Sequence, residues 1–286
     1  MKKNIIPLIL EKAGIKDEIV SIVSRGGGDV SDSYSIKTKQ ESYFLKINSL
    51  SFESNFQSEF TGLQKITESN AIVCPKPLSV GTYENYSYLL MSNLHNLGRA
   101  TYKIGKHIAQ MHKNSQTNQY GFPILTFCGS TPLDNQMTNE PWSEWFARHR
   151  IGAILDQIGT SKVSTRSKDQ IVERIIQLLK DHDADSVPCL VHGDLWSGNM
   201  GETDGQPCIY DPGCYYGDGE VDLAMTELFG GFGSKFYEEY KKVLPIHEGY
   251  QRRKPIYNLF HILNHALMFG GFYVTEAEHE IEKLFK

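Results

Sequence analysis

The chain has 286 residues, of which 40% are hydrophobic and 22% charged, and its formal net charge at pH 7 is −5. This composition is typical of a globular protein with one large domain or two lobes. Lysine and glutamate are mixed along the chain, and the lack of a basic stripe argues against electrostatic binding of nucleic acid. The five cysteines are odd in number and scattered, which argues against a disulfide framework or a structural zinc site.

The basic and then apolar start of the chain, residues 1–10, is interrupted at Glu11, and no small-residue cleavage site follows it. We therefore expect no secretion signal. No window approaches the roughly 20 apolar residues that a membrane-spanning helix needs. These patterns predict a cytoplasmic protein with neither a membrane nor a nucleic-acid partner.

The first ninety residues show strand patterns on both sides of one helix. Residues 19–48 alternate apolar and polar side chains, which predicts strands joined by turns. Residues 53–66 carry apolar side chains at helical spacing, and Tyr88–Met91 is a short apolar strand that runs into a polar junction. This order is that of the small lobe of a kinase. We predict a two-lobed α+β fold, with a nucleotide-binding lobe at residues 1–91 and a mainly helical lobe at 92–286.

Beyond the junction the pattern is mostly helical, with apolar faces near residues 104–112 and 171–178. Residues 114–141 are rich in Thr, Asn, Gly and Pro and predict a long loop, and residues 159–167 predict a shorter one. Two similar Phe-Gly-Gly-Phe segments occur later in the chain. We interpret them as turns that end helices.

The segment Val191–Asn199, followed by Ile209-Tyr-Asp-Pro212, has the spacing of a phosphoryl-transfer site. Protein kinases carry H-R-D-L-x-x-x-N, in which the Asp takes the acceptor proton and the Asn holds Mg²⁺, with a second metal-binding Asp further on. Asp194 is accordingly the candidate catalytic base, and Asn199 and Asp211 are the candidate Mg²⁺ ligands. The alternative is that Asp194 and Asn199 only shape a turn.

Lys46 alternates with apolar residues in a predicted strand, as does the kinase lysine that contacts the nucleotide phosphates. Glu59, on the predicted helix that follows, would hold Lys46 through an ion pair. An exposed strand lysine is the alternative. Adenine contacts at the junction, near Met91 and Asn93, would be made by backbone groups.

The glycines Gly26, Gly27 and Gly28 would let backbone N–H groups approach the phosphates of ATP. The segment departs from G-x-G-x-x-G, and a simple hairpin turn is the alternative. No Walker G-x-x-x-x-G-K-[ST] motif occurs in the chain, which argues against a P-loop NTPase.

Other polar residues near the motif are expected to support it. His192 would brace the catalytic loop through hydrogen bonds. Asp222 would accept N–H bonds from that loop or cap the next helix, and Asp218 would also support the site. His261 and His265 have metal-compatible spacing but no evident third ligand, so we expect them to pack or make polar contacts.

Taken together, these segments resemble the fructosamine-3-kinase (ketosamine-3-kinase) family, within the aminoglycoside-phosphotransferase and protein-kinase-like fold. The resemblance covers nearly the whole chain. Its most specific parts are the Trp-Ser-Gly-Asn form of the catalytic loop and the run Asp211-Pro-Gly-Cys-Tyr-Tyr-Gly-Asp218.

The resemblance implies phosphorylation of the 3-hydroxyl of a ketosamine, small or protein-linked, with ATP and Mg²⁺. The 3-phosphate would destabilise the sugar adduct and release the amine, which makes the activity a deglycation repair. By motif position, Asp194 matches the base, Asn199 and Asp211 the metal ligands, and Lys46 the nucleotide lysine. Trp196 would lie near the sugar.

Further substrate contacts are predicted from residue chemistry, because aromatic faces suit sugar C–H surfaces and arginines orient hydroxyls or carboxylates. The candidates are Trp142, Trp145, Arg148 and Arg150. The near-helical spacing of the two tryptophans equally fits core positions. Two further alternatives stay open: a kinase for another small alcohol such as choline or an aminoglycoside, and a non-catalytic kinase-like binding module.

Overall fold

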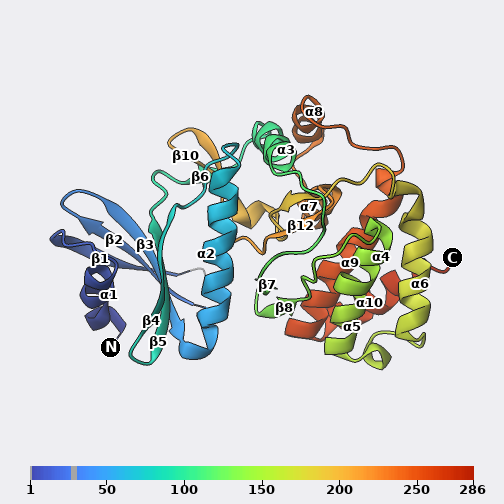
Figure 1. Cartoon of the computed structure of the whole chain (residues 1–286), viewed down its shortest axis with the longest axis horizontal. Coiled ribbons are helices and arrows are strands. Elements are labelled where there is room, and N and C mark those ends of the chain that lie inside the picture. Colours follow the sequence, from blue (N-terminus) through green and yellow to red (C-terminus); the bar gives the residue numbers. More distant parts are fainter. Residues whose placement is uncertain (1, 27–30) are drawn as a thin grey trace.

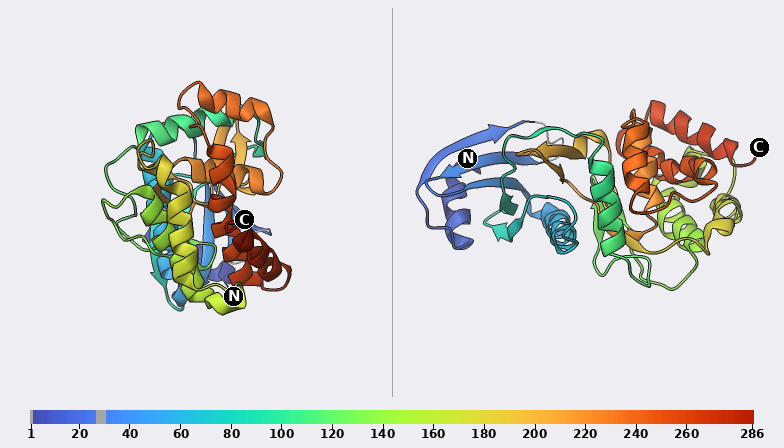
Figure 2. Two further views of the ribbon diagram at one scale, coloured as in Figure 1. Left: turned by 90° about the vertical axis from the view of Figure 1, so that its right-hand side faces the viewer. Right: turned by 90° about the horizontal axis from the view of Figure 1, so that it is seen from above.

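The computed structural model describes residues 2–26 and 31–286. Figure 1 shows an antiparallel sheet with helices α1 and α2 on one side of the molecule, and the helices from α3 onward on the other side. The view from above in Figure 2 shows the same two parts end to end. The predicted α+β kinase-like fold is confirmed.

The sheet of the first part has five antiparallel strands in the order β1-β2-β3-β5-β4. The strands are β1 (Ile19–Arg25), β2 (Asp32–Thr38), β3 (Ser42–Ser49), β4 (Pro77–Tyr83) and β5 (Tyr86–Ser92). Side chains alternate between the two faces of such a sheet. In β5, Leu90 therefore packs with α1 (Ile6–Lys12), while Leu89 and Met91 pack with α2 (Glu53–Glu68).

Helix α2 joins the sheet to the second part of the chain. Its apolar face, which includes Phe56 and Leu63, covers the sheet. On another side, a Cβ added at Gly62 would lie 3.2 Å from the Cys214 sulfur and 3.4 Å from Pro212. The missing side chain at Gly62 thus lets α2 pack closely on the segment after Asp211.

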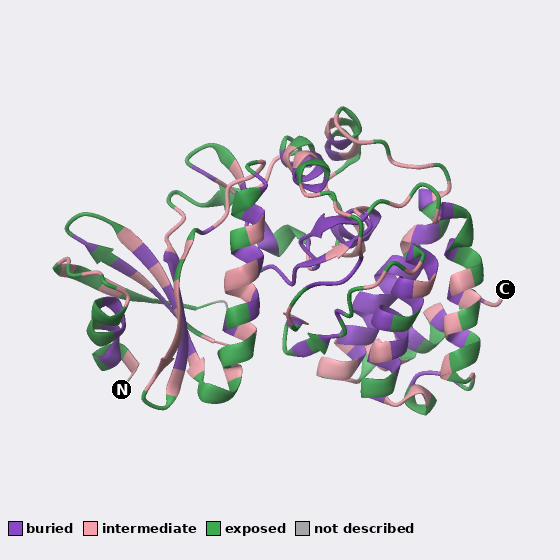
Figure 3. Ribbon diagram, in the orientation of Figure 1, coloured by how far each residue is buried: buried purple, intermediate pink, exposed green. Residues whose placement is uncertain are grey.

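The second part is mainly helical, as predicted. Its α-helices are α3 (Ile104–Asn114), α4 (Trp142–Phe146), α5 (Ala153–Ile158), α6 (Lys168–Leu179), α7 (Glu220–Leu228), α8 (Ser234–Lys241), α9 (Tyr250–Phe269) and α10 (Phe272–Lys283). Short 3₁₀ or π turns complete the helical structure of the described residues: η1 (Lys2–Ile5), η2 (Leu50–Phe52), η3 (Ala147–Gly152), η4 (Thr160–Lys162), η5 (Lys180–His182) and η6 (Ser197–Asn199). Figure 3 shows that the buried residues of this part gather around α4 and α9.

Short strands connect the two parts and shape the site. They are β6 (Gly98–Arg99), β7 (Thr126–Cys128), β8 (Thr131–Leu133), β9 (Cys189–Val191), β10 (Met200–Thr203), β11 (Gln206–Ile209) and β12 (Tyr215–Gly217). β9 pairs with β12, and β10 pairs with β11. Because β9 and β10 bracket residues 192–199 while β11 and β12 bracket residues 210–214, these pairings place the two predicted site segments side by side.

The predicted loop at residues 114–141 contains the hairpin β7–β8, whose three-residue strands are too short to show a period. Both Phe-Gly-Gly-Phe segments follow helix ends, those of α7 and α9, as predicted. None of the helices that the structure describes is long and apolar enough to cross a bilayer.

Candidate active site

A cleft of about 890 Å³ lies between the sheet, α2 and the segment 192–199. Both parts of the molecule line it. The lining includes Gly26, Ser33, Phe44, Lys46, Phe56, Glu59, Met91, Asn93, Cys128, Asp194, Trp196, Asn199 and Asp211. Most of the residues predicted from the sequence to bind nucleotide or metal therefore share one cavity.

Lys46 occupies this cleft because of the alternation in β3. Its neighbours Leu45 and Ile47 face α1, so Lys46 faces α2 and the cleft. Its Nζ donates to Glu59 Oε1 at 2.7 Å and to Asp211 Oδ1 at 2.7 Å. Burial alone would lower the pKa of Lys46, but the charges of Glu59 and Asp211 outweigh it and hold the pKa above its ordinary value. The ammonium group is therefore charged at neutral pH.

The chain turns sharply at Asp211, just beyond the end of β11. Asp211 has φ of 57°, in the left-handed region that residues other than glycine rarely adopt. Backbone strain of this kind concentrates at functional sites and persists only where the surroundings enforce it. Here the turn lets the Asp211 carboxylate reach Lys46 across the cleft.

The segment 192–199 is a tight loop held by its own side chains. Asn199 Nδ2 donates to the backbone oxygen of Asp194 at 2.9 Å and to its Oδ2 at 3.1 Å. Gly193 has φ of 79°, and a Cβ there would lie 2.2 Å from the Gly213 oxygen, so only glycine fits. Burial and the negative charges of Asp211 and Asp222 raise the pKa of Asp194 to about 7, against the hydrogen bond from Asn199.

His192 links the two segments of the site. Its Nε2 donates to the Tyr210 oxygen at 3.0 Å, and its Nδ1 accepts the Asp194 N–H at 3.3 Å. Burial lowers the pKa of His192, so the ring is neutral and carries its proton on Nε2. Through these two hydrogen bonds, the His192 ring connects the loop at Asp194 to the end of β11 beside Asp211.

Asp222, in the first turn of α7, accepts hydrogen bonds from the backbone of the same loop. Its Oδ2 accepts the His192 N–H at 2.7 Å, and its Oδ1 accepts the Gly193 N–H at 3.0 Å. His112 Nε2 lies 3.1 Å from Asp222 Oδ2. Burial would raise the pKa of Asp222, but the hydrogen bond from His112 and the loop N–H groups lower it overall. The sequence left open whether Asp222 accepts N–H bonds from the loop or caps the next helix. The structure shows that it accepts the loop N–H bonds.

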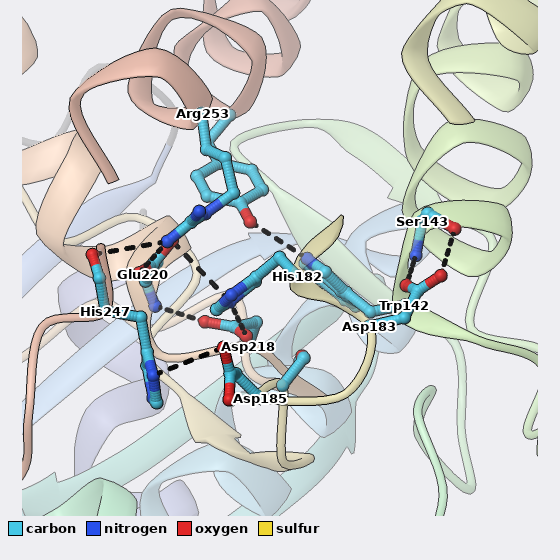
Figure 4. Close-up of polar contacts among 12 residues, drawn as sticks. Trp142, Ser143, His182, Asp183, Asp185, Asp218, Glu220, His247 and Arg253 are labelled. Atoms are coloured by element: carbon cyan, nitrogen blue, oxygen red, sulfur yellow. Dashed lines mark hydrogen bonds and ion pairs between the residues drawn. The ribbon is translucent and has the colours of Figure 1, made fainter. Parts of the chain in front are cut away.

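A second buried charged cluster orients the start of α7 (Figure 4). His182 Nε2 lies 2.9 Å from Asp218 Oδ2, and Asp218 Oδ1 accepts the Glu220 N–H at 2.8 Å. Arg253 binds both oxygens of Glu220 at 2.7 Å. The guanidinium already neutralises Glu220, so this cluster needs no metal ion. Asp218 thus fixes the turn that presents Asp222 to the loop.

Asn199 and Asp211 offer the donor atoms that Mg²⁺ prefers. Asn199 uses its amide nitrogen to bind Asp194, which leaves its carbonyl oxygen for other contacts. Asp211 uses Oδ1 for Lys46, which leaves Oδ2. An amide oxygen and a carboxylate oxygen are hard ligands, and they fit a magnesium ion.

The family model described as fructosamine kinase matches residues 1–286. The chain belongs to the fructosamine kinase family. A candidate ketoamine kinase of Vibrio parahaemolyticus is 38% identical over 271 residues, which cover 93% of each chain. A protein-ribulosamine 3-kinase of rice, described as chloroplastic, is 34% identical over 273 residues, which cover 92% of this chain and 78% of the rice protein.

Solved structures agree with this assignment. The crystal structure of a candidate fructosamine-3-kinase from Haemophilus somnus is 28% identical, with a TM-score of 0.87 over 100% of this chain and 98% of that one. An aminoglycoside phosphotransferase is 17% identical, with a TM-score of 0.61 over 99% of this chain and 98% of that one. The second likeness shows the shared fold alone.

In this fructosamine kinase, Trp196 lines the cleft beside Asp194 and Asn199. Its indole is 38% exposed. A Cβ added at Gly198 would lie 2.2 Å from the indole ring, so the ring packs directly on the Gly198 backbone. The Trp-Ser-Gly-Asn segment is therefore one steric unit, in which the glycine makes room for the tryptophan.

The prediction that Trp142 and Trp145 bind substrate is wrong. Both are fully buried, and the Trp142 Nε1 donates to the Tyr257 hydroxyl at 3.1 Å. Their rings stack with centroids 5.7 Å apart. Helical spacing places both on the inner face of α4, where Tyr257 of α9 covers Trp142 and Tyr215 stacks on Trp145, so the alternative interpretation as core residues holds.

The two arginines after them do not line the cleft either. Arg150 is 1% exposed, and its guanidinium lies 3.8 Å from the centre of the Tyr215 ring. Arg148 is exposed and pairs with Glu144 at 2.9 Å. Substrate binding by these arginines is thus also corrected: one is a buried stacking residue and the other a surface ion-pair partner.

The structure brings some of the other residues predicted to bind the nucleotide to the cleft. Gly26, Met91 and Asn93 line the cleft, whereas Gly27 and Gly28 lie outside the described residues. The Asn93 N–H donates to the Ser42 oxygen at 3.1 Å, which continues the sheet past β5. Adenine contacts at Met91 and Asn93 stay a prediction.

The sequence did not reveal two residues beside Asp194. Potential ligand atoms of Cys128, Asp194 and His261 all lie within 4.8 Å of one another. Cys128 ends β7, inside the segment predicted to be a loop, and His261 comes from the middle of α9. His265, one turn further on, is not part of this group. No short-range sequence pattern predicts contacts between segments that lie so far apart in the chain.

Proposed function

We propose that this fructosamine kinase transfers the γ-phosphoryl group of ATP to the 3-hydroxyl of a ketosamine. The observation that carries the proposal is one cleft in which the Lys46 ion pairs face Asp194, in a chain that the family model matches from end to end. The names of the Vibrio and rice relatives support the acceptor class. Residues 1–91 would form the nucleotide lobe and residues 92–286 the acceptor lobe.

In this mechanism Asp194 is the catalytic base. Its carboxylate accepts the proton of the acceptor hydroxyl while that oxygen attacks the γ-phosphorus. The bond from the γ-phosphorus to the β–γ bridging oxygen breaks, and ADP leaves. A pKa near 7 suits a base that works at neutral pH, because it can take up the proton and return it to water.

The other residues position the phosphates. Lys46, held by Glu59, would contact the α- and β-phosphates, and Gly26, Gly27 and Gly28 would cover them with backbone N–H groups. Asn199 and Asp211 would hold Mg²⁺, which neutralises charge on the phosphate oxygens when it is bound. His192, Asp218 and Asp222 would keep the loop at Asp194 in place, and Trp196 would contact the sugar.

The test is ADP release from ATP and Mg²⁺ with ribulosamines, fructosamines and erythrulosamines, free and protein-linked. We expect turnover with a ketosamine and a product phosphorylated on O3, which ³¹P and ¹³C NMR would identify. Choline and an aminoglycoside serve as competing acceptors. The absence of ADP release with every ketosamine, or faster turnover of a competing acceptor, would refute the proposal.

A further inference from the structure

Five rings form a continuous surface that begins at the catalytic loop, and we name it the aromatic strip. It consists of Trp196, Phe229, His265, Phe269 and Tyr273. Ring centroids lie 6.2 Å apart between Trp196 and Phe229, and 5.4 Å apart between Phe229 and His265. His265 in turn lies 5.7 Å from Phe269 and 4.9 Å from Tyr273.

Helix α9 gives the strip its direction. His261, His265 and Phe269 follow one another at intervals of four residues, so they share one face of the helix. The row rises by about 12 Å along the axis, at 1.5 Å a residue. Exposure grows along it, from 7% at His261, beside Asp194, to 63% at Phe269. This row on α9, whose outer members His265 and Phe269 belong to the strip, therefore leads from Asp194 to the surface.

Aromatic side chains of the strip are unusually open to solvent. Trp196 is 38% exposed, Phe229 46% and Phe269 63%. Single exposed apolar residues are common, but a contiguous row of them marks a binding surface. Because Trp196 also lines the cleft, this surface continues the acceptor side of the site.

We propose that the aromatic strip binds the group carried by the amine nitrogen of the ketosamine, and that it favours aromatic or large apolar amines. This inference rests on the proposed function. With the 3-hydroxyl at Asp194, the nitrogen lies four covalent bonds further along the substrate, within reach of Trp196. A ketosamine nitrogen is a protonated secondary amine, which aromatic faces attract. Its substituent then extends over Phe229 and Phe269.

The experiment compares two ketosamines with the same sugar, one built on benzylamine and one on ethanolamine. We expect a KM lower by roughly fivefold or more for the benzylamine adduct, with similar kcat, as aromatic contacts would give. Phe229→Ala and Phe269→Ala should each remove most of this difference. They should leave the KM for ATP and the turnover of the ethanolamine adduct unchanged.

Phe272→Ala is the matched control, because Phe272 is 75% exposed and adjoins Tyr273 at the outer end of the strip. It should keep the preference. Equal KM values for the two adducts in the parent protein would overturn the proposal, as would equal losses in all three variants. If the strip instead joins two copies of the chain, Phe229→Ala and Phe269→Ala will convert a dimer to a monomer without changing the preference, and the proposal fails. Turnover of the ethanolamine adduct tests the proposed function separately.

Discussion

Lys46 Nζ lies 2.7 Å from Asp211 Oδ1, although the two residues are 165 positions apart in the chain. The lysine comes from the sheet and the aspartate from the strand end beside the catalytic loop. Their ion pair therefore joins the two walls of the cleft. Under the proposed function, Lys46 would contact the nucleotide phosphates and Asp211 the metal ion, so ligand binding would replace this ion pair with other charge contacts.

Removal of the lysine charge should therefore affect both activity and stability. We expect Lys46→Met to lower kcat/KM for ATP by about 10²- to 10³-fold. Because the Glu59 side chain is only 14% exposed, its unpaired charge should also lower the free energy of unfolding by about 3 kcal/mol, as measured in urea.

Adding Glu59→Gln to Lys46→Met should restore stability but not activity, because it removes the unpaired charge and not the need for the lysine. Lys37→Met, at an exposed position of β2, is the control and should change neither quantity. Full activity of Lys46→Met would contradict the assigned role.

Replacement of Asp194, the proposed catalytic base, should separate chemistry from nucleotide binding. Asp194→Asn should lower kcat by about 10²- to 10⁴-fold, because the amide cannot accept the proton. The Kd for ATP, measured by calorimetry, should stay within a few-fold of that of the parent. Asp204→Asn, in the turn between β10 and β11, is the control for charge and should be fully active. A near-parental rate for Asp194→Asn would exclude Asp194 as the base.

The contact of Asp222 with the loop predicts a positioning effect. Asp222→Asn leaves one loop N–H without its acceptor, and we expect it to lower the free energy of unfolding by about 2 kcal/mol. It should also lower kcat, because the loop that carries Asp194 is less well held.

Asp183→Asn distinguishes these two effects. Asp183 accepts the Ser143 N–H at 2.7 Å, away from the loop, so this variant should lose stability and keep its kcat (Figure 4). Equal kcat values for the two variants would show that Asp222 supports only the fold.

The buried His261 should make the free energy of unfolding decrease as the pH falls below about 6.5. Burial, followed by the charge of His265, lowers the pKa of His261 from 6.5 to about 3. Between these values the unfolded chain binds a proton there and the folded chain does not, so stability is lost as pH falls below about 6.5. At pH 5.5 this loss amounts to about 1 kcal/mol.

The measurement is thermal unfolding of the parent and of His261→Asn at pH 7.5 and 5.5. The parent should lose more in Tm between the two pH values than the variant does. His279→Asn, at an exposed position of α10, should behave like the parent. An equal change in Tm for the parent and His261→Asn would contradict the assignment.

Residues that act through local spacing were predictable from the sequence. The alternation in β3 predicted a cleft-facing Lys46, and the kinase-like spacing singled out Asp194, Asn199 and Asp211. Helical spacing was less informative for Trp142, because an apolar face can be covered by a ligand or by another helix. Only the position of α9 decides this.

The remaining part of the site depends on contacts between distant segments. Cys128 and His261 meet Asp194 from β7 and α9, and no short-range pattern encodes such a meeting. Arg150 is another residue whose role depends on contacts with distant segments. Its charge suggested a substrate contact, whereas stacking on Tyr215 and a hydrogen bond to Asn135 Oδ1 make it part of the core.

Two of the three tryptophans are buried, so the fluorescence of the third can report on the cleft. Trp142 and Trp145 are buried in the core, while Trp196 lines the cleft and is 38% exposed. A soluble quencher such as acrylamide will therefore act mainly on Trp196. If the acceptor covers the Trp196 ring, as the proposed function predicts, it will protect the Trp196 emission from the quencher, and binding can be titrated without label and without turnover.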